Sequence, residues 1–383
     1  MNSSLPELVE AATPKAVELR RLLHRHPEPS NQEHQTTALI STALESHGLI
    51  HQLRTPRTGL WIDVGGEPRV GFRADLDALP IHEPPGNAPR SQNPGWMHAC
   101  GHDAHAAIGF GIALTLSQLD LDAGVRILFQ PAEEANPGGA SEFVAEGLVD
   151  GLKGLLAFHV DPTLQPNRIG SKVGPVTGSA DSLRIVLSGP GGHTSRPHKT
   201  VDLVSAAAMV VKELPEAVRR ALDSRIPIVT VFGSIRGGSA ANVIPTEVEL
   251  TGTVRTLDRS TWEDLPGLVE SVLGSISAIS GAHFELDYRQ GIPPVVNDAG
   301  VVDAATWAIA DALGPDTIVA VETSMGGEDF ASYLDTVPGA LLRLGSHSGG
   351  GDLHSSSFRI NDASIGTGIL AGTAAVVGML ERL

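Results

Sequence analysis

The pattern of apolar and polar positions predicts that helices and strands alternate along the first part of the chain. Residues 5–25, 33–47 and 103–119 carry apolar side chains at helical spacing. Between and after them lie short apolar runs that end at Gly, Pro or Asp, which is typical of strands: LWIDVGG, RVGFRADLDALP, VRILFQP and GLLAFHV. A further helix is predicted for ASEFVAEGLVD. This alternation favours a mostly parallel sheet covered by helices.

A different order of elements begins near Gly174. The predicted strands are SADSLRIVLSG, IPIVTVFGSIRGG, TEVELTGTVRTL and AHFELDYRQG, and two long helical stretches separate the first from the second and the third from the fourth. This β-α-β-β-α-β order is that of a ferredoxin-like unit. Helix and strand signals then resume in a remainder too short for its own domain. We therefore expect an α/β protein with a discontinuous domain, residues 1–175 and 292–383, and an inserted domain, residues 176–291.

Composition and charge narrow the class of protein. The formal net charge is −17 and the 27 Lys and Arg residues are dispersed, which argues against a nucleic-acid surface. The single cysteine cannot form an intramolecular disulfide, and no basic segment followed by an apolar one opens the chain, so we expect a cytoplasmic protein. The apolar C-terminal stretch contains four glycines and is predicted to be a buried helix, not a membrane span. A small-molecule substrate fits these properties.

Polar clusters occur where the apolar runs of the first domain stop. They are Asp75 with Asp77, Glu133 with Glu134, His159, and His354. Because functional sites in open α/β sheets form at the carboxyl ends of the strands, we expect all four clusters to face one crevice.

The stretch HACGHDAHAA, residues 98–107, contains the richest set of candidate metal ligands. Cys100 and His102 are two residues apart, a spacing that points both side chains to one side of an extended segment and therefore suits a loop. A thiolate with imidazoles and a carboxylate suits Zn, or Mn and Co with less preference for sulfur. A buried, inert cysteine is an alternative. So is a cysteine nucleophile with a histidine base, which leaves the paired glutamates without a use.

The pair Glu133 and Glu134 predicts two different roles, because adjacent residues that leave a strand point in different directions. One carboxylate could bind metal while the other acts as general base on the reacting water. An acidic turn at the start of the next helix is the alternative. Asp75 and Asp77 could orient a metal-bound imidazole or could simply form a turn.

Two loops of the inserted domain carry further candidates. GPGGHTSRPHKTVD contains His193 and His198, and GGSAANVIP contains Asn242. Ordinary loop conformations also explain the glycines and the asparagine, so the residues alone leave both interpretations open.

Taken in order, LHRHPE, FRADLDALP, MHACGHDAH, FQPAEE, HV, GPGGHTSRPH, NVIP, GGEDF and LHS resemble the motifs of the M20 metallopeptidase family. The resemblance is to its amidohydrolase branch of N-acyl-amino-acid, hippurate-type and auxin-conjugate hydrolases, and it runs nearly end to end. It implies metal-dependent hydrolysis of the amide bond of N-acyl amino acids. The proline-rich PPGNAPRSQN departs from the family pattern, in a segment expected to flank the acyl pocket.

The resemblance also implies roles for single residues. Glu133 would be the general base, Asp77 and Asp75 would hold the site in order, and His193 with Asn242 would bind substrate or stabilise the oxyanion in a partner subunit's active site. This makes a homodimer, or a tetramer, the expected assembly. Two divalent ions, Zn or Mn with Co or Ni as further options, would be bound by Cys100, His102, Glu134, His159 and His354.

The inserted domain would act as a lid that closes over the site, with hinges at SKVGPVTG and QGIPPV. Two other functions compete with the amidohydrolase interpretation. A dipeptidase of the same family would need a place for a free substrate amino group, and the sequence shows none clearly. A non-catalytic metal-binding protein would have no use for Glu133.

Overall fold

The computed structural model describes residues 4–383 and divides the chain into two compact units. Unit 1 comprises the chain up to Val176 together with Val296–Glu322 and Asp329–Leu383. Unit 2 comprises Thr177–Val295 and Thr323–Glu328. The chain therefore passes between the units within SKVGPVTG, directly after QGIPPV, between Glu322 and Thr323, and within GGEDF.

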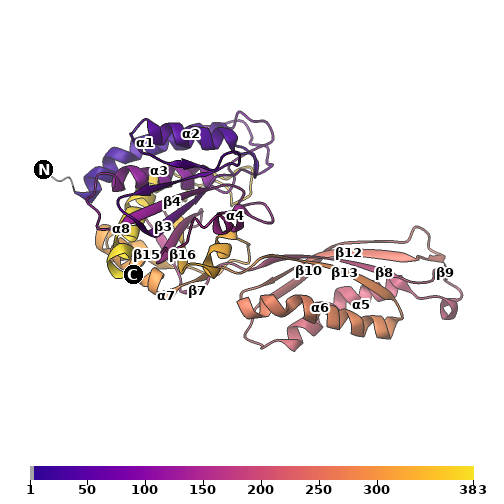
Figure 1. Ribbon diagram of the computed structural model, residues 1–383. Helices are drawn as coiled ribbons and strands as arrows, with labels where there is room; N and C mark the ends of the chain where they lie inside the picture. Colours follow the sequence, from indigo (N-terminus) through magenta and orange to yellow (C-terminus); the bar gives the residue numbers. More distant parts are fainter. Residues whose placement is uncertain (1–3) are drawn as a thin grey trace. The chain divides into compact units, whose positions relative to one another are not determined.

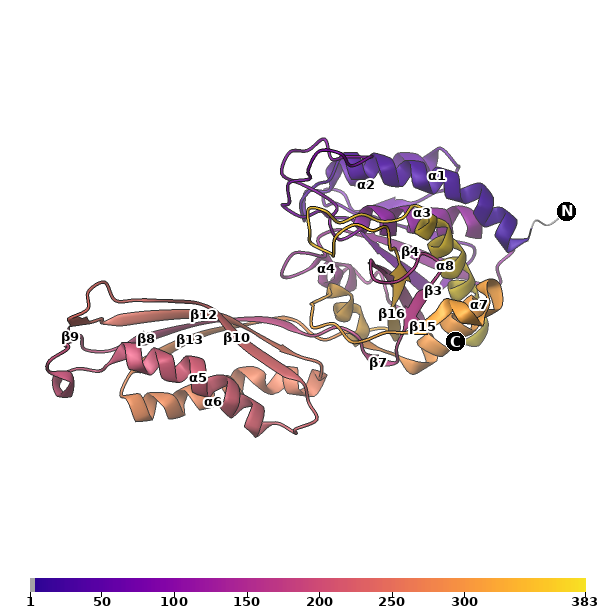
Figure 2. The ribbon, with the colours of Figure 1, turned by 180° about the vertical axis from the view of Figure 1, so that it is seen from behind.

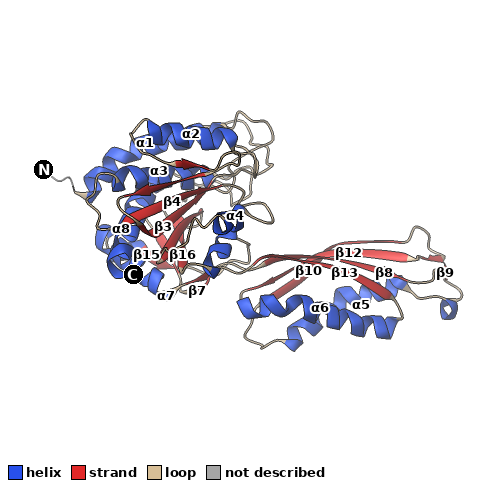
Figure 3. Cartoon of the chain, viewed as in Figure 1, coloured by secondary structure: helices blue, strands red, loops and turns tan. Residues whose placement is uncertain are grey.

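An eight-stranded sheet forms the centre of unit 1 (Figures 1 and 3), in the order β1-β2-β4-β3-β5-β16-β6-β15. The strands are β1 Gln52–Leu53, β2 Leu60–Val64, β3 Pro68–Asp75, β4 Gly124–Gln130, β5 Gly154–Asp161, β6 Ile169–Ser171, β15 Ile318–Ala320 and β16 Gly339–Gly345. The neighbours β4, β3, β5 and β16 run parallel. Their side chains are almost all buried, as expected for parallel strands covered on both faces.

The helices of unit 1 are α1 Leu5–Arg25, α2 His34–Glu45, α3 His102–Leu116, α4 Gly139–Ala145, α7 Ala299–Leu313 and α8 Ala363–Arg382. After its polar first turn α3 is apolar on all sides, and every one of its 15 residues is buried, between the sheet and helices α1 and α8. α8 is long and apolar enough to span a membrane, but 67% of its apolar window is buried inside the protein, as in the core helix of a globular domain.

Unit 2 has a four-stranded antiparallel sheet in the order β10-β12-β8-β13. Its elements follow one another as β8 Ala180–Ser188, α5 Leu203–Ala221, β10 Ile228–Gly237, β12 Glu247–Thr256, α6 Arg259–Ser280 and β13 His283–Ile292. Both helices cover the same face of the sheet (Figure 2) and pack on alternate strand residues such as Leu183, Ile185 and Leu187. The predicted fold class is confirmed: a mostly parallel α/β sheet and a separate ferredoxin-like sheet.

Short elements were missed by the sequence pattern. They include β1, β6, β15, and the two-stranded ladders of β7 Gly174–Pro175 with β14 Val296–Asn297 and β9 Gly192–His193 with β11 Val243–Ile244. The helix predicted for residues 140–150 is too long, since α4 ends at Ala145. Gly147, at φ 73°, lets the amide of Leu148 reach back to the carbonyl of Phe143 and close the helix end.

Candidate metal centre

The carboxyl ends of parallel strands bring the predicted polar clusters of unit 1 together. Asp75 is the last residue of β3, Glu133 and Glu134 follow β4, and His159 lies near the end of β5. His354 lies in the loop after β16, where its amide donates to the carbonyl of Ala99. All four clusters contribute side chains to groups whose donor atoms lie within 4.8 Å of one another.

Cys100 and His102 meet at a junction between loop and helix. The prediction of a loop for both was wrong for His102, which is the first residue of α3. Gly101 precedes the helix at φ 83°, and a Cβ there would lie 2.5 Å from Cγ2 of Val160. Glycine is therefore required on both conformational and steric grounds, and its left-handed backbone, not an extended segment, brings the two side chains together.

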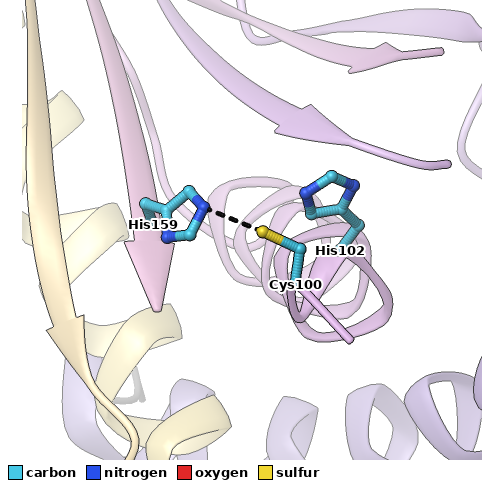
Figure 4. A group of neighbouring side chains, drawn as sticks. All are labelled: Cys100, His102 and His159. Atoms are coloured by element: carbon cyan, nitrogen blue, oxygen red, sulfur yellow. Dashed lines mark hydrogen bonds between the residues drawn. The ribbon is translucent and has the colours of Figure 1, made fainter. Parts of the chain in front are cut away.

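Cys100 is the common member of two donor groups. Its Sγ lies 3.3 Å from Nε2 of His159 (Figure 4) and 3.3 Å from Nε2 of His354. His354 in turn has Nε2 at 3.2 Å from Oε1 of Glu134. Cys100, His102 and His159 are buried, whereas the side chain of His354 is 52% exposed and marks the solvent side of the cluster.

Both buried imidazoles are oriented by their Nδ1 atoms. Nδ1 of His102 lies 3.2 Å from Oδ1 of Asp77, and Nδ1 of His159 lies 2.9 Å from the carbonyl oxygen of Val160. Each contact directs Nε2 into the cluster. Nε2 of His102 is buried and has no hydrogen-bond partner among residues 4–383. Burial alone would lower the pKa of His102, but the charge of Asp75 and the hydrogen bond with Asp77 outweigh it and hold the pKa well above its ordinary value. A divalent metal ion would take the place of the proton on Nε2, beside a thiol and carboxylates, so the residues present suit the group that the sequence predicts.

Asp77 connects His102 to the glutamate pair. Its carboxylate also accepts hydrogen bonds from the amides of Glu133 and Glu134, at 3.0 and 2.9 Å, and from the hydroxyl of Ser30 at 2.7 Å. Burial by itself would raise the pKa of Asp77, but the hydrogen bond and charge of His102 and the other donors outweigh burial and lower it. Asp77 therefore remains an anion, and it fixes the imidazole of His102 relative to the turn that carries Glu133 and Glu134.

Asp75 belongs to a second chain of contacts that sequence reasoning only partly anticipated. Its Oδ1 lies 2.6 Å from Nδ1 of His105, and its Oδ2 accepts a hydrogen bond from Arg73 at 2.5 Å. Arg73 also donates to Asp329 of the GGEDF stretch at 2.7 Å. His105 and Arg73 were missed, although signals existed: Arg73 shares a strand face with Asp75, and His105 lies three residues after His102 on α3.

The protonation states of the candidate ligands differ across the cluster. Burial raises the pKa of the Cys100 thiol and holds the pKa of His159 well below its ordinary value, so its imidazole stays neutral. The contacts with Cys100 and Glu134 raise the pKa of His354 to about 10. A metal ion would replace the proton on His354 and would stabilise the thiolate of Cys100, because ligands must lose their protons to bind.

The remaining predicted residues belong to unit 2. His193 is in β9 and Asn242 immediately precedes β11, and the carbonyl oxygen of Asn242 accepts a hydrogen bond from the amide of Thr194 at 3.2 Å. Both residues are exposed. Nδ1 of His193 accepts from the amide of Ser195 at 3.1 Å and lies 2.8 Å from its hydroxyl. His198 lies on a short 3₁₀ turn, Pro197–Lys199.

Comparison with known protein families shows to which family a chain with this fold and these donor residues belongs. Residues 71–376 match the family model described as Peptidase family M20/M25/M40. The chain belongs to this family and is a hydrolase.

Individual relatives agree with this assignment. The chain is 38% identical over 298 residues to the N-acyl-L-amino acid amidohydrolase of Geobacillus stearothermophilus. The match covers 76% of this chain and 80% of the relative. The crystal structure of the YXEP protein of Bacillus subtilis, described as a dinuclear metal binding peptidase from M20 family, is 32% identical with a TM-score of 0.85, covering 98% of this chain and 100% of that one.

One further relative is a longer protein. The chain is 41% identical over 368 residues to a Rhodococcus jostii protein named putative glutamate–cysteine ligase 2-3. The match covers 95% of this chain but 46% of the relative, so the chain spans about half the length of that protein.

Proposed function

We propose that the protein hydrolyses the amide bond of N-acyl amino acids. Two divalent ions, Zn or Mn with Co and Ni as further options, would be held by Cys100, His102, Glu134, His159 and His354. The observation that carries the proposal is the buried Nε2 of His102, which Asp77 orients toward a thiol and two glutamates and which has no hydrogen-bond partner in the described part of the chain. The name of the Geobacillus stearothermophilus relative supports the substrate class.

In the proposed reaction the metal ligands, Glu133 and Asp77 have different roles. When bound, the ions would polarise the scissile carbonyl and make water more acidic. Glu133 is buried, with Oε2 at 3.8 Å from Nε2 of His102. From there it accepts a proton from the attacking water and delivers it to the leaving amine, as a general base and then a general acid. Asp77 keeps Glu133 in place through the backbone.

The assembly and location form part of the same proposal. His193, with Asn242 beside it, would complete the active site of a partner subunit in a homodimer or tetramer by binding the substrate carboxylate or the oxyanion. Unit 2 would act as the lid. The reaction would take place in the cytoplasm on small molecules, without nucleic acid or membrane.

The test is hydrolysis of a substrate panel by the full chain after chelation and reconstitution with Zn, Mn or Co in separate samples. The panel contains N-acetyl, N-benzoyl and indoleacetyl amino acids and dipeptides. We expect metal-dependent release of the amino acid from at least one acyl conjugate. A preference for dipeptides would indicate a dipeptidase of the same family. No turnover despite stoichiometric metal uptake would indicate a non-catalytic metal-binding protein.

A further inference from the structure

Glu33 is a fully buried carboxyl group that the proposed reaction does not use. It immediately precedes α2 and its exposed fraction is 0%. Oε1 accepts hydrogen bonds from the amides of Asn31 and Ala132, at 2.9 and 2.8 Å, and Oε2 accepts one from the hydroxyl of Thr58 at 2.7 Å. The side chain therefore joins three segments that lie far apart in sequence, and one of them leads directly into the glutamate pair.

The segment that Glu33 holds has an unusual backbone. Ala132 lies at φ 57°, in the left-handed region that a residue with a Cβ adopts only when its surroundings impose it. The amides of Glu133 and Glu134, which follow, donate to Asp77. Three successive amides are thus held by two buried carboxyl groups, and Glu33 holds the one at the left-handed residue.

We propose that Glu33 is a positioning residue: by accepting the amide hydrogen of Ala132 it maintains the left-handed turn that directs the carboxylate of Glu133 toward the metal ligands. The inference rests on the proposed function, in which Glu133 is the general base. Glu33 itself touches neither substrate nor metal. It acts on the reaction through the direction in which Glu133 leaves the backbone.

Geometry, and not charge, should then be what matters at position 33. Burial raises the pKa of Glu33 to about 7, although the hydrogen bond from Thr58 opposes it, so the neutral form is already accessible near neutral pH. In Glu33→Gln the amide oxygen still accepts from Ala132 and Asn31, and the amide nitrogen can donate to Thr58. In Glu33→Asp the charge remains, but the chain is one methylene shorter and cannot reach Ala132 and Thr58 together.

The experiment compares Glu33→Gln, Glu33→Asp and Glu33→Ala in the full, metal-reconstituted enzyme with the N-acetyl amino acid that the wild type cleaves fastest. We expect Glu33→Asp and Glu33→Ala to lower kcat by about tenfold or more, since small displacements of a catalytic group are costly. KM and the number of bound metal ions should stay unchanged, and Glu33→Gln should retain kcat within about threefold.

Thr58→Val is the matched control, because it removes the other hydrogen bond of Glu33 and leaves the contact with Ala132. It should lower Tm without lowering kcat. If Glu33→Asp keeps the wild-type kcat, or if its loss of kcat only follows a loss of bound metal or of folded protein, the inference is overturned. Should Glu33→Ala fail to fold, the order of Glu33→Gln and Glu33→Asp still decides.

Glu133→Gln, measured in parallel, separates the two claims. An inactive Glu133→Gln beside a fully active Glu33→Asp overturns the inference alone. If Glu133→Gln keeps full turnover with its metals bound, the proposed function fails and the inference fails with it.

Discussion

In unit 1 the candidate ligands form a mostly buried cluster, and neighbouring residues set their orientations. In unit 2, by contrast, His193 and Asn242 are exposed, beside the short β9–β11 pair. Burial explains the contrast. A buried polar group must find partners or lose stability, so Asp77, His102 and Glu33 each have defined contacts before any ligand arrives. An exposed group has water as its partner, and its role depends on what binds beside it. The candidate metal ligands are thus organised within unit 1, whereas the role proposed for His193 and Asn242 depends on what binds beside them.

The largest expected effect tests the buried region. Glu133→Gln keeps the size of the side chain but removes the base, so kcat should fall by about 10²–10⁴-fold. Metal stoichiometry should not change, because Glu133 is not a proposed ligand. Steady-state kinetics with metal analysis of the same sample would check this, and retained turnover at full metal loading would contradict it.

Asp77→Asn perturbs the buried cluster of unit 1 without removing a proposed ligand. The anion that orients His102 is lost, and one of the two backbone amides of the glutamate pair loses its acceptor. Metal affinity or activity should fall by about 10- to 100-fold. Titration of the chelated protein with Zn or Mn measures the affinity. The control is Asp63→Asn, which removes a surface ion pair with Arg126 and should match wild type.

The pH dependence of stability tests whether Glu33 is buried as described. Its pKa is raised from 4.5 to about 7, so the folded state holds a proton that the unfolded state loses. Stability is therefore lost as pH rises from about 4.5 through about 7, by an amount of up to about 3 kcal/mol. Glu33→Gln should gain stability relative to wild type across this window. Urea unfolding of metal-free samples at several pH values would show it, and a constant difference would count against it.

Mixing two inactive variants tests the exposed region. If His193 serves a partner's site, His193→Ala and Glu133→Gln are each deficient, but a mixed dimer contains one site with both native residues. An equal mixture should recover about a quarter of the wild-type activity after subunit exchange. No recovery, despite mixed dimers shown by native mass spectrometry, would indicate that His193 acts within its own chain or not at all.

The smallest effect is expected far from either region. The side chain of Asp202 caps α5 by accepting from the amide of Ser205 at 3.1 Å. Asp202→Ala should cost about 1 kcal/mol of stability and leave kcat unchanged. Thermal unfolding and the standard assay would measure both, and a large loss of activity would show that the fold of unit 2 matters to the reaction beyond its stability.

The long helices and strands and the candidate donor residues follow from the amino-acid sequence alone. Hydrophobic periodicity and Gly or Pro punctuation are local, so α1, α3 and the ferredoxin-like order could be predicted without a structure. The ordered motifs also mark Cys100 and His102 as candidate metal ligands.

The contacts that support these donor groups come from the folded chain and could not be read from the sequence. Glu33 meets Ala132 across 99 positions and Arg73 meets Asp329 across 256. His24 of LHRHPE lies 2.8 Å from Asp103, which follows the proposed ligand His102. Strands as short as β1 and β15 exist only through their neighbours in the sheet. No local pattern encodes such pairings, because each is stable only when distant segments are buried together and their polar groups must satisfy one another.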